Sequence, residues 1–118
     1  MQYTKPKLFP RETADHTFRW QFGDRIFDVT LTQYRLICVD KNTRTGEYKT
    51  DMIYYDAIGG VRVVRSLGGT PFHVLSITSG ATTFLQLLFA DTAQGVNMMD
   101  DFQMKLAHKR SVWYLSGK

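Results

Sequence analysis

The chain has 118 residues, which is the usual size of one folded domain. Hydrophobic residues make up 43% and charged residues 22%, so the composition is that of a globular protein and argues against disorder. Fifteen Lys and Arg against eleven Asp and Glu give a net charge of +4, which is compatible with an acidic partner but does not require one. One cysteine excludes an internal disulfide, and three scattered histidines argue against structural zinc.

Residues 1–15 are polar and contain Pro6 and Pro10, which predicts an extended lead-in to a single domain that spans residues 1–118. This segment lacks the apolar stretch that a signal peptide contains. The apolar runs elsewhere are far shorter than the roughly 20 residues of a membrane-spanning helix. We therefore expect a cytoplasmic protein.

Residues 16–90 contain seven short apolar runs separated by turn residues, a pattern typical of an all-β sandwich or barrel. The first run alternates over residues 16–22, so that Phe18, Trp20 and Phe22 share one face of a strand. The other six predicted strands cover residues 25–31, 35–40, 47–55, 61–65, 72–78 and 82–89.

The hydrophobic period changes after Ala90 and predicts one helix over residues 91–110. Asp91 and Gln94 have the spacing of a capping box, and Gly95 is expected to weaken the first turn by about 1 kcal/mol relative to Ala. The apolar stripe of this helix consists of Val96, Met99, Phe102 and Leu106. Residues 111–118 form an apolar tail that we expect to dock on the domain or on a partner.

Two segments resemble runs found in bacterial pleckstrin-homology (PH) and GRAM domains. The first, residues 29–40, is similar to the pattern (V/L)-x-L-T-x-x-R-L-I-x-x-D through Leu31, Thr32, Arg35, Leu36, Ile37 and Asp40. The second, residues 53–61, is similar to I-P-Y-x-x-I-x-x-V, with Tyr54 at the place of the proline. The resemblance implies a mainly β fold, a seven-stranded and partly open antiparallel barrel that is capped by the C-terminal helix.

Local chemistry accounts for some of these residues independently. Thr32 and Arg35 flank a tight turn, where a hydroxyl can bond the local backbone and a guanidinium can reach a carboxylate. Ile58 follows a turn at Asp56 and is placed to join the second group of strands to the first.

The residues that could support catalysis are isolated from one another, so we predict that the chain is not an enzyme and binds no metal or cofactor. Cys38 lies among apolar residues in a strand, which favours a buried and inert thiol. His73 alternates with apolar residues, which favours a satisfied strand histidine. The adjacent Asp100 and Asp101 diverge on the helix, and the Gly pairs lack the Lys of a phosphate loop.

Basic residues suggest a possible anion site. The PH-like resemblance implies that Arg25, Lys41, Arg44 and Lys49 gather at the open rim of the barrel, where they could hold a phosphate group or an acidic peptide. However, the first loop of the predicted barrel is only Gly23 and Asp24, without the basic residues of phosphoinositide binders. Ordinary solvated charge is therefore the favoured interpretation of these four residues.

Three functions remain open. The first is protein binding, either self-assembly or binding of a partner chain, with Tyr54, Tyr55, Trp113 and Tyr114 as candidate interface residues and with unblunted strand edges at 52–55 and 61–64. The second is binding of anionic lipid at the rim. The third, nucleic-acid binding, is the least favoured because Arg62 and Arg65 are predicted on opposite faces of one strand.

Overall fold

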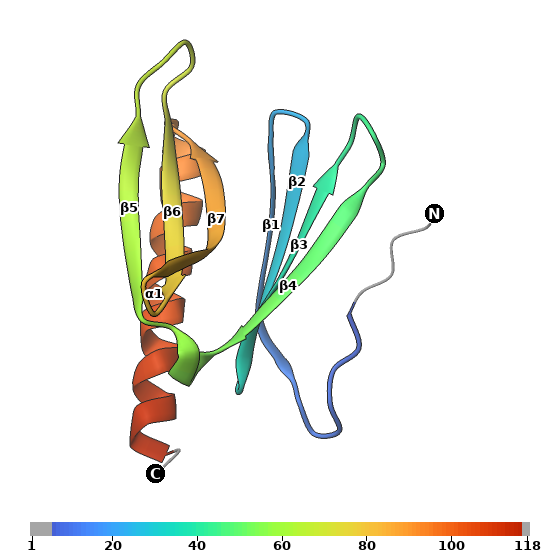
Figure 1. Ribbon diagram of the computed structural model, residues 1–118, viewed down its shortest axis with the longest axis vertical. Coiled ribbons are helices and arrows are strands. Elements are labelled where there is room, and N and C mark those ends of the chain that lie inside the picture. The colour runs from blue at the N-terminus through green and yellow to red at the C-terminus, as the bar shows by residue number, and fades with distance from the viewer. Residues whose placement is uncertain (1–5, 117–118) are drawn as a thin grey trace.

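The computed structural model describes residues 6–116 and consists of two antiparallel sheets and a C-terminal helix (Figure 1). The four-stranded sheet has the order β1 (Ala14–Phe22), β2 (Arg25–Thr32), β3 (Arg35–Asn42) and β4 (Tyr48–Tyr54). A short 3-10 helix, η1 (Tyr55–Ala57), leads to the three-stranded sheet, which has the order β5 (Gly60–Ser66), β6 (Phe72–Ser79) and β7 (Thr82–Ala90). The helix is α1 (Ala93–Ser116).

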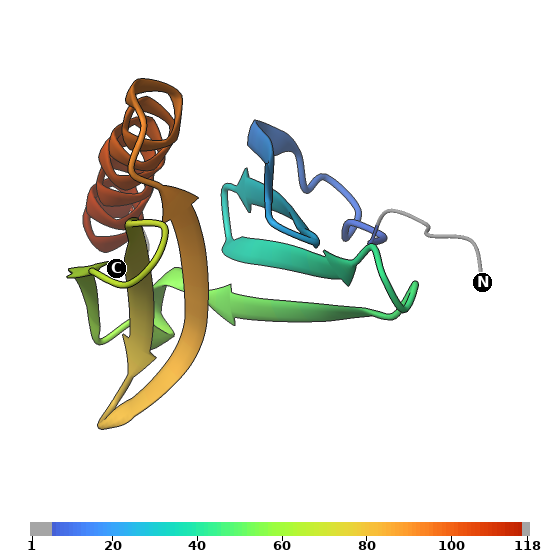
Figure 2. The same ribbon diagram turned by 90° about the horizontal axis from the view of Figure 1, so that it is seen from above.

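The predicted succession of seven strands and one helix is confirmed, with strand bounds that differ by one or two residues. The strands do not form the predicted seven-stranded barrel, because no strand ladder joins the two sheets among the described residues. Figure 2 shows the two sheets at an angle to each other, with α1 and the lead-in at opposite sides of the molecule. Neither helix in the described residues has the length and apolar character needed to cross a membrane.

A single hydrophobic core joins the two sheets and the helix. Phe102 of α1 is fully buried and meets Phe18 of β1 edge-to-face, with 5.4 Å between ring centroids. Trp20 stacks against Phe27 and Phe89 with centroid distances of 5.1 and 4.5 Å, and its indole N–H donates to the Leu88 carbonyl at 2.8 Å. The predicted helix stripe is thus part of the core, with Met99, Phe102 and Leu106 buried and Val96 half-buried.

The start of α1 differs from the predicted capping box. Thr92 is the cap: its Oγ1 accepts the backbone N–H of Gly95 at 3.1 Å, and its carbonyl accepts the N–H of Val96 at 2.9 Å. A Cβ added to Gly95 would lie 2.1 Å from the carbonyl oxygen of Ala90. Glycine at this position therefore lets the first helical turn approach the end of β7, a role that outweighs its low helix propensity.

The predicted tail is not a separate element, because α1 continues to Ser116; residues 117–118 lie outside the described part. Trp113 accounts for the extension, since it is half-buried and packs against the core from the last turns of the helix. Arg110 also ties this end of α1 to the strand linker by donating to the Ile58 carbonyl at 3.4 Å. Ile58 itself is buried, as its predicted role requires.

Candidate functional site

A buried ion pair fastens the lead-in to the four-stranded sheet. The Arg35 guanidinium donates to both carboxylate oxygens of Glu12, with Nε–Oε2 at 2.9 Å and Nη2–Oε1 at 3.0 Å. The Thr32 hydroxyl donates to the same Glu12 carboxylate at 2.8 Å. These donors, led by Arg35, lower the pKa of Glu12 to about 2. The predicted reach of Arg35 to a carboxylate is confirmed, and its partner lies 23 residues earlier in the chain.

The turn between β2 and β3 is built around this ion pair. Thr32 Oγ1 accepts the backbone N–H groups of Tyr34 at 3.1 Å and Arg35 at 3.0 Å, as predicted for a hydroxyl in this turn. The Tyr55 hydroxyl donates to the carbonyls of Thr32 at 2.6 Å and Arg35 at 3.1 Å. Tyr55 is 0% exposed, so the structure corrects it from a candidate interface residue to a core residue.

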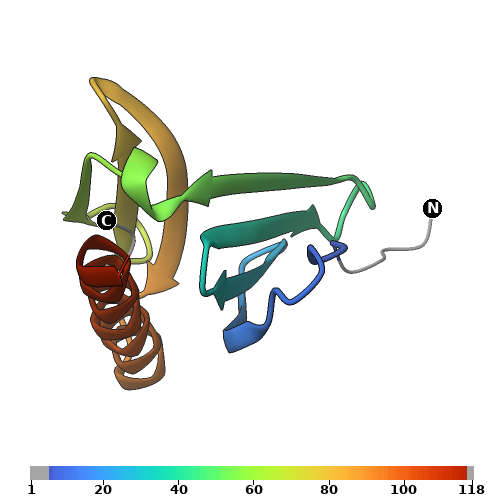
Figure 3. The ribbon, with the colours of Figure 1, turned by 90° about the horizontal axis from the view of Figure 1, so that it is seen from below.

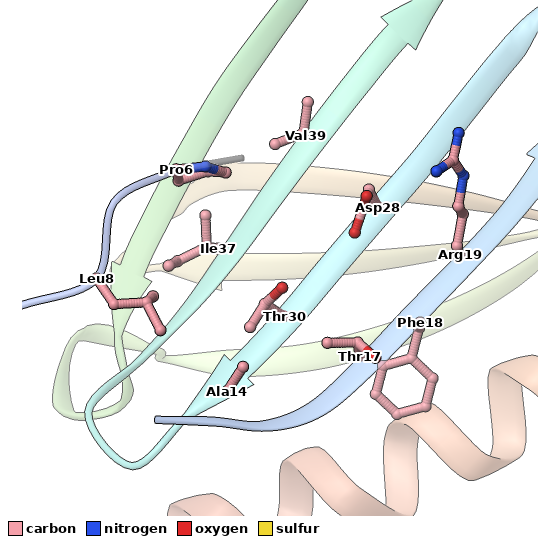
Figure 4. A pocket seen from close by; sticks show the side chains of 10 residues that line it. All are labelled: Pro6, Leu8, Ala14, Thr17, Phe18, Arg19, Asp28, Thr30, Ile37 and Val39. Carbon is pink, nitrogen blue, oxygen red and sulfur yellow. The ribbon is translucent and has the colours of Figure 1, made fainter. Parts of the chain in front are cut away.

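Residues 6–13 of the lead-in cover the β3 part of the outer face of the four-stranded sheet, which is the face turned away from the core, whereas Thr17 and Arg19 of β1 stay exposed there. Ile37 of β3 points outward from this sheet and is nevertheless only 2% exposed. Pro6 and Leu8 line a hollow of about 300 Å³ together with Ile37 and Val39 (Figure 4). Figure 3 shows the lead-in running along this sheet on the side away from α1. The chain therefore uses its own N-terminal segment as the cover of this face.

The predicted basic rim does not form one cationic cluster. Arg25 is ion-paired with the buried Asp40, and Lys49 lies opposite Asp40 in the register of β3 and β4. Arg44 approaches Asp24 at 3.5 Å. Lys41 lies on the other face of the sheet, because it is one residue from Asp40 in the same strand.

Two hollows of about 290 and 430 Å³ open beside Arg25, Asp40 and Lys49. Glu47 lines the smaller of these hollows, and Asp51 lines the larger. The structure thus brings Arg25 and Lys49 together but places carboxylates beside them, which leaves little attraction for an anion.

The remaining candidate interface residues belong to two elements. Tyr54 is exposed at the end of β4, Tyr114 is exposed on α1, and Trp113 is half-buried. On β4, the thioether of Met52 accepts a hydrogen bond from Arg35 Nη1 at 2.8 Å. The edge of β4 is thereby tied to the Glu12–Arg35 ion pair.

The three-stranded sheet has an open edge at β5. Within the described residues only β6 pairs with β5, and Figure 1 shows β5 at the margin of the molecule. The principal contacts of α1 are with β7, η1 and β1, so the helix leaves this edge uncovered. Val64 of β5 is 51% exposed and Val63 is 37% exposed. Exposed strand edges of this kind are the usual sites of strand addition.

The outer face of the same sheet is also uncovered. Its strands align Arg62 with Ser76 and Gln86, and Val64 with Val74 and Leu88, in two rows across the sheet. A hollow of about 670 Å³ lies on this face and extends from Leu67 in the β5–β6 loop to Ala81 in the β6–β7 turn. The unblunted valines of the sequence indicated the edge but not the hollow, because the hollow depends on how three strands align.

The reactive side chains occupy unreactive environments. Cys38 is fully buried, and this burial raises the pKa of its thiol to about 12, as expected for an inert cysteine. His73 contacts Asp91 through Nε2 at 3.1 Å, and Arg65 forms an ion pair with the same carboxylate. In the part of the chain that the structure describes, no three His, Cys, Asp or Glu residues are grouped to hold a metal ion.

Comparison of the chain with protein-family models, with curated proteins and with solved structures finds no significant match. The geometry of the two sheets is therefore the basis for assigning a function. Their outer faces differ in one respect that bears on binding: the lead-in covers β3 on one of them, whereas the other and its β5 edge are open.

Proposed function

We propose that this chain is a non-catalytic protein-binding module of PH-like architecture that binds an extended segment of a protein chain along β5. The observation that carries the proposal is the open edge of β5, which presents backbone groups and the exposed Val63 and Val64 to solvent. An added strand would extend the three-stranded sheet through backbone hydrogen bonds, and side-chain pairs across the new ladder would supply selectivity.

The PH-like part of the proposal is supported by the order of the elements and by the helix. Seven strands and a C-terminal helix follow one another as the resemblance implies. Met99, Phe102 and Leu106 of α1 are buried in the core that the two sheets share. A helix in this position acts as the cap of an otherwise open pair of sheets.

The edge of β4 supports binding less well than the edge of β5. Met52 is engaged by Arg35, and Lys49 and Asp51 share a hollow with residues of β7, so a strand added to β4 would have to enter the space between the sheets. The lipid alternative also has less support, since Arg25 and Arg44 have carboxylates as neighbours.

The test is a selection of short unstructured peptides from a random display library, followed by NMR titration of the labelled protein with each selected peptide. We expect amide shift changes and slowed amide exchange to concentrate on β5. The variant Val63→Lys should lose most of this binding, because a charge placed at the edge opposes strand addition. Met104→Lys, on the exposed side of α1, is the matched control and should bind normally.

Peptides that perturb only other elements would contradict the proposal. Light scattering distinguishes its two forms: a concentration-dependent mass that Val63→Lys abolishes indicates self-assembly through β5, and a constant monomer mass indicates a separate partner. Anionic vesicles and single-stranded DNA serve as comparators, and a shift of β5 by either in preference to peptides would favour the corresponding alternative.

A further inference from the structure

The open face beside β5 has an unusual distribution of charge. The described residues that line its hollow include two arginines and five hydroxyl or amide side chains, but no carboxylate. Arg65 has a partner, because it is ion-paired with Asp91. Arg62 lies in the row with Ser76 and Gln86, and its side chain forms no hydrogen bond or ion pair with another residue of the described chain. Arg62 is thus an exposed cation on the edge strand, and no carboxylate of the described residues pairs with it.

We infer that the segment that binds β5 is an acidic extended peptide of another protein, with a carboxylate that pairs with Arg62 and an aliphatic side chain that packs on Val64. This inference rests on the proposed function and names the chemistry of the partner.

The spacing of the two residues sets the sequence pattern of the partner. Arg62 and Val64 point to the same face of the sheet, because they are two residues apart in one strand. Residues opposite each other in an added antiparallel strand have Cβ atoms about 4.5–5.5 Å apart. The partner should therefore carry Asp or Glu opposite Arg62 and a Val, Ile or Leu opposite Val64, with one residue between them.

The chain contains an intramolecular version of this contact. The lead-in crosses the outer face of the other sheet and brings the Glu12 carboxylate to Arg35, while Leu8 and Pro6 lie over the aliphatic Ile37. Arg35 and Ile37 are again two residues apart on one strand and share a face. An arginine followed by an aliphatic residue on the outer face of β3 is thus already covered by a segment that supplies an acid and apolar side chains.

Charge also distinguishes the possible occupants of this face. Two copies paired through β5 would bring Arg62 and Arg65 of both chains onto adjacent strands, and like charges in neighbouring strands are unfavourable. Single-stranded nucleic acid is bound through bases stacked on aromatic side chains, and no aromatic residue is among the described residues that line the hollow. An acidic peptide is the occupant that matches both the arginine and the valine.

The experiment uses acetylated and amidated nine-residue peptides in which valine and threonine alternate, with valine at both ends, and the central valine is replaced by Asp, Asn or Lys. Binding of each peptide to the full chain is measured by NMR titration of the β5 amides. We expect the Asp peptide to bind about two- to fivefold more tightly than the Asn peptide, the range typical of an exposed ion pair, and the Lys peptide to bind most weakly. The preference for Asp should decrease as salt is added.

Charge reversal gives the decisive arm of the experiment. Arg62→Glu should invert the order, so that the Lys peptide binds more tightly than the Asp peptide. Arg44→Glu makes the same change of net charge in the exposed β3–β4 loop and should leave the order unchanged, which excludes an effect of overall charge. Thermal unfolding of both variants shows whether the fold is intact.

The outcomes separate the inference from the proposed function. If the Asp and Asn peptides bind β5 equally, or if Arg62→Glu does not invert the order, the acidic partner is overturned while strand addition at β5 stands. If no peptide perturbs β5 at any concentration reached, the proposed function and this inference both fail. A stronger perturbation of the Arg62 face by single-stranded DNA than by the Asp peptide would also overturn the inference.

Discussion

The two sheets of this protein differ in how their outer faces are covered. The lead-in lies over β3 on the outer face of the four-stranded sheet, where Arg35, Ile37 and Val39 are buried. The outer face of the three-stranded sheet has no such cover, and Val64 there is half exposed. One outer face is thus covered over β3 by a segment of the same chain, whereas the other outer face and the β5 edge are open to a second chain.

The arginines of these two faces illustrate the same difference. Arg35 is buried and its charge is balanced by Glu12, which makes it part of the structure. Arg62 is exposed and has no such partner among the described residues. Removal of a buried charge partner is expected to destabilise the fold, whereas a change at an exposed cation is expected to alter binding.

The largest expected effect concerns the core that both sheets share. Phe102→Ala should lower the free energy of unfolding by about 3–5 kcal/mol, because Phe102 is fully buried between the sheets and contacts Phe18. Urea denaturation measures the change. Met104→Ala, on the exposed side of the same helix, should lower the unfolding free energy by less than about 0.5 kcal/mol. A loss below about 1 kcal/mol for Phe102→Ala would contradict the shared core.

A matched pair of substitutions tests the comparison of the outer faces directly. Ile37→Ala should lower the free energy of unfolding by about 2–4 kcal/mol, because the lead-in buries this side chain. Val64→Ala on the open face should lower it by only about 0.5–1 kcal/mol, mainly through strand propensity. Equal losses in denaturation experiments would mean that the two faces are covered alike.

The ion pair that holds the lead-in is the next test. Glu12→Gln should lower the free energy of unfolding by about 2 kcal/mol, because it leaves the buried Arg35 without a charged partner. Amide hydrogen exchange should rise in residues 9–13 and stay unchanged in β5. Normal protection of the lead-in in this variant would show that the apolar contacts of Leu8 and Phe9 suffice.

The pH dependence of stability should report the same ion pair. The pKa of Glu12 is lowered to about 2 in the folded chain. The unfolded chain therefore binds more protons than the folded chain when the pH falls through the ordinary carboxyl range. The stability that Glu12 contributes is therefore complete above that range and is lost as the pH falls toward 2. Denaturation at several acidic pH values should show a steeper loss in the wild type than in Glu12→Gln. Asp15, whose pKa is also lowered by Lys109, is present in both proteins.

The smallest expected effect lies at the junction of β7 and α1. Gly95→Ala should lower the free energy of unfolding by about 1 kcal/mol, because the steric conflict with the Ala90 carbonyl exceeds the gain in helix propensity. Gln94→Ala, exposed in the same turn, should raise the unfolding free energy slightly or leave it unchanged. A melting temperature of Gly95→Ala above that of the wild type would contradict the close approach.

Several features were predictable because they depend on neighbours in the sequence. The alternation of Phe18, Trp20 and Phe22 predicted a strand with one apolar face, and the spacing of Met99, Phe102 and Leu106 predicted the buried side of the helix. Thr32 was assigned to its turn for the same reason, since a hydroxyl bonds backbone groups two and three residues away.

Other features could not be predicted because they depend on segments far apart in the chain. The cap of α1 is Thr92 rather than Asp91, since the helix begins where the end of β7 allows it. Tyrosine is a residue type that is frequent at interfaces, but η1 directs the Tyr55 side chain into the core. The ion pairs of the basic rim could not be predicted either, because Arg25–Asp40 and Arg44–Asp24 each join residues from different strands or loops.

The sequence by itself determined the seven strands, the C-terminal helix and the side that the first strand and the helix turn to the core, because these follow from the period of apolar residues within a few positions. Only the tertiary structure decided which outer face is covered. Glu12 reaches Arg35 across 23 residues, and Arg62 meets no acid at all among the described residues. A charge can be buried only when the folded chain places an opposite charge beside it. The hydrophobic pattern of a single strand contains no information on that oppositely charged partner.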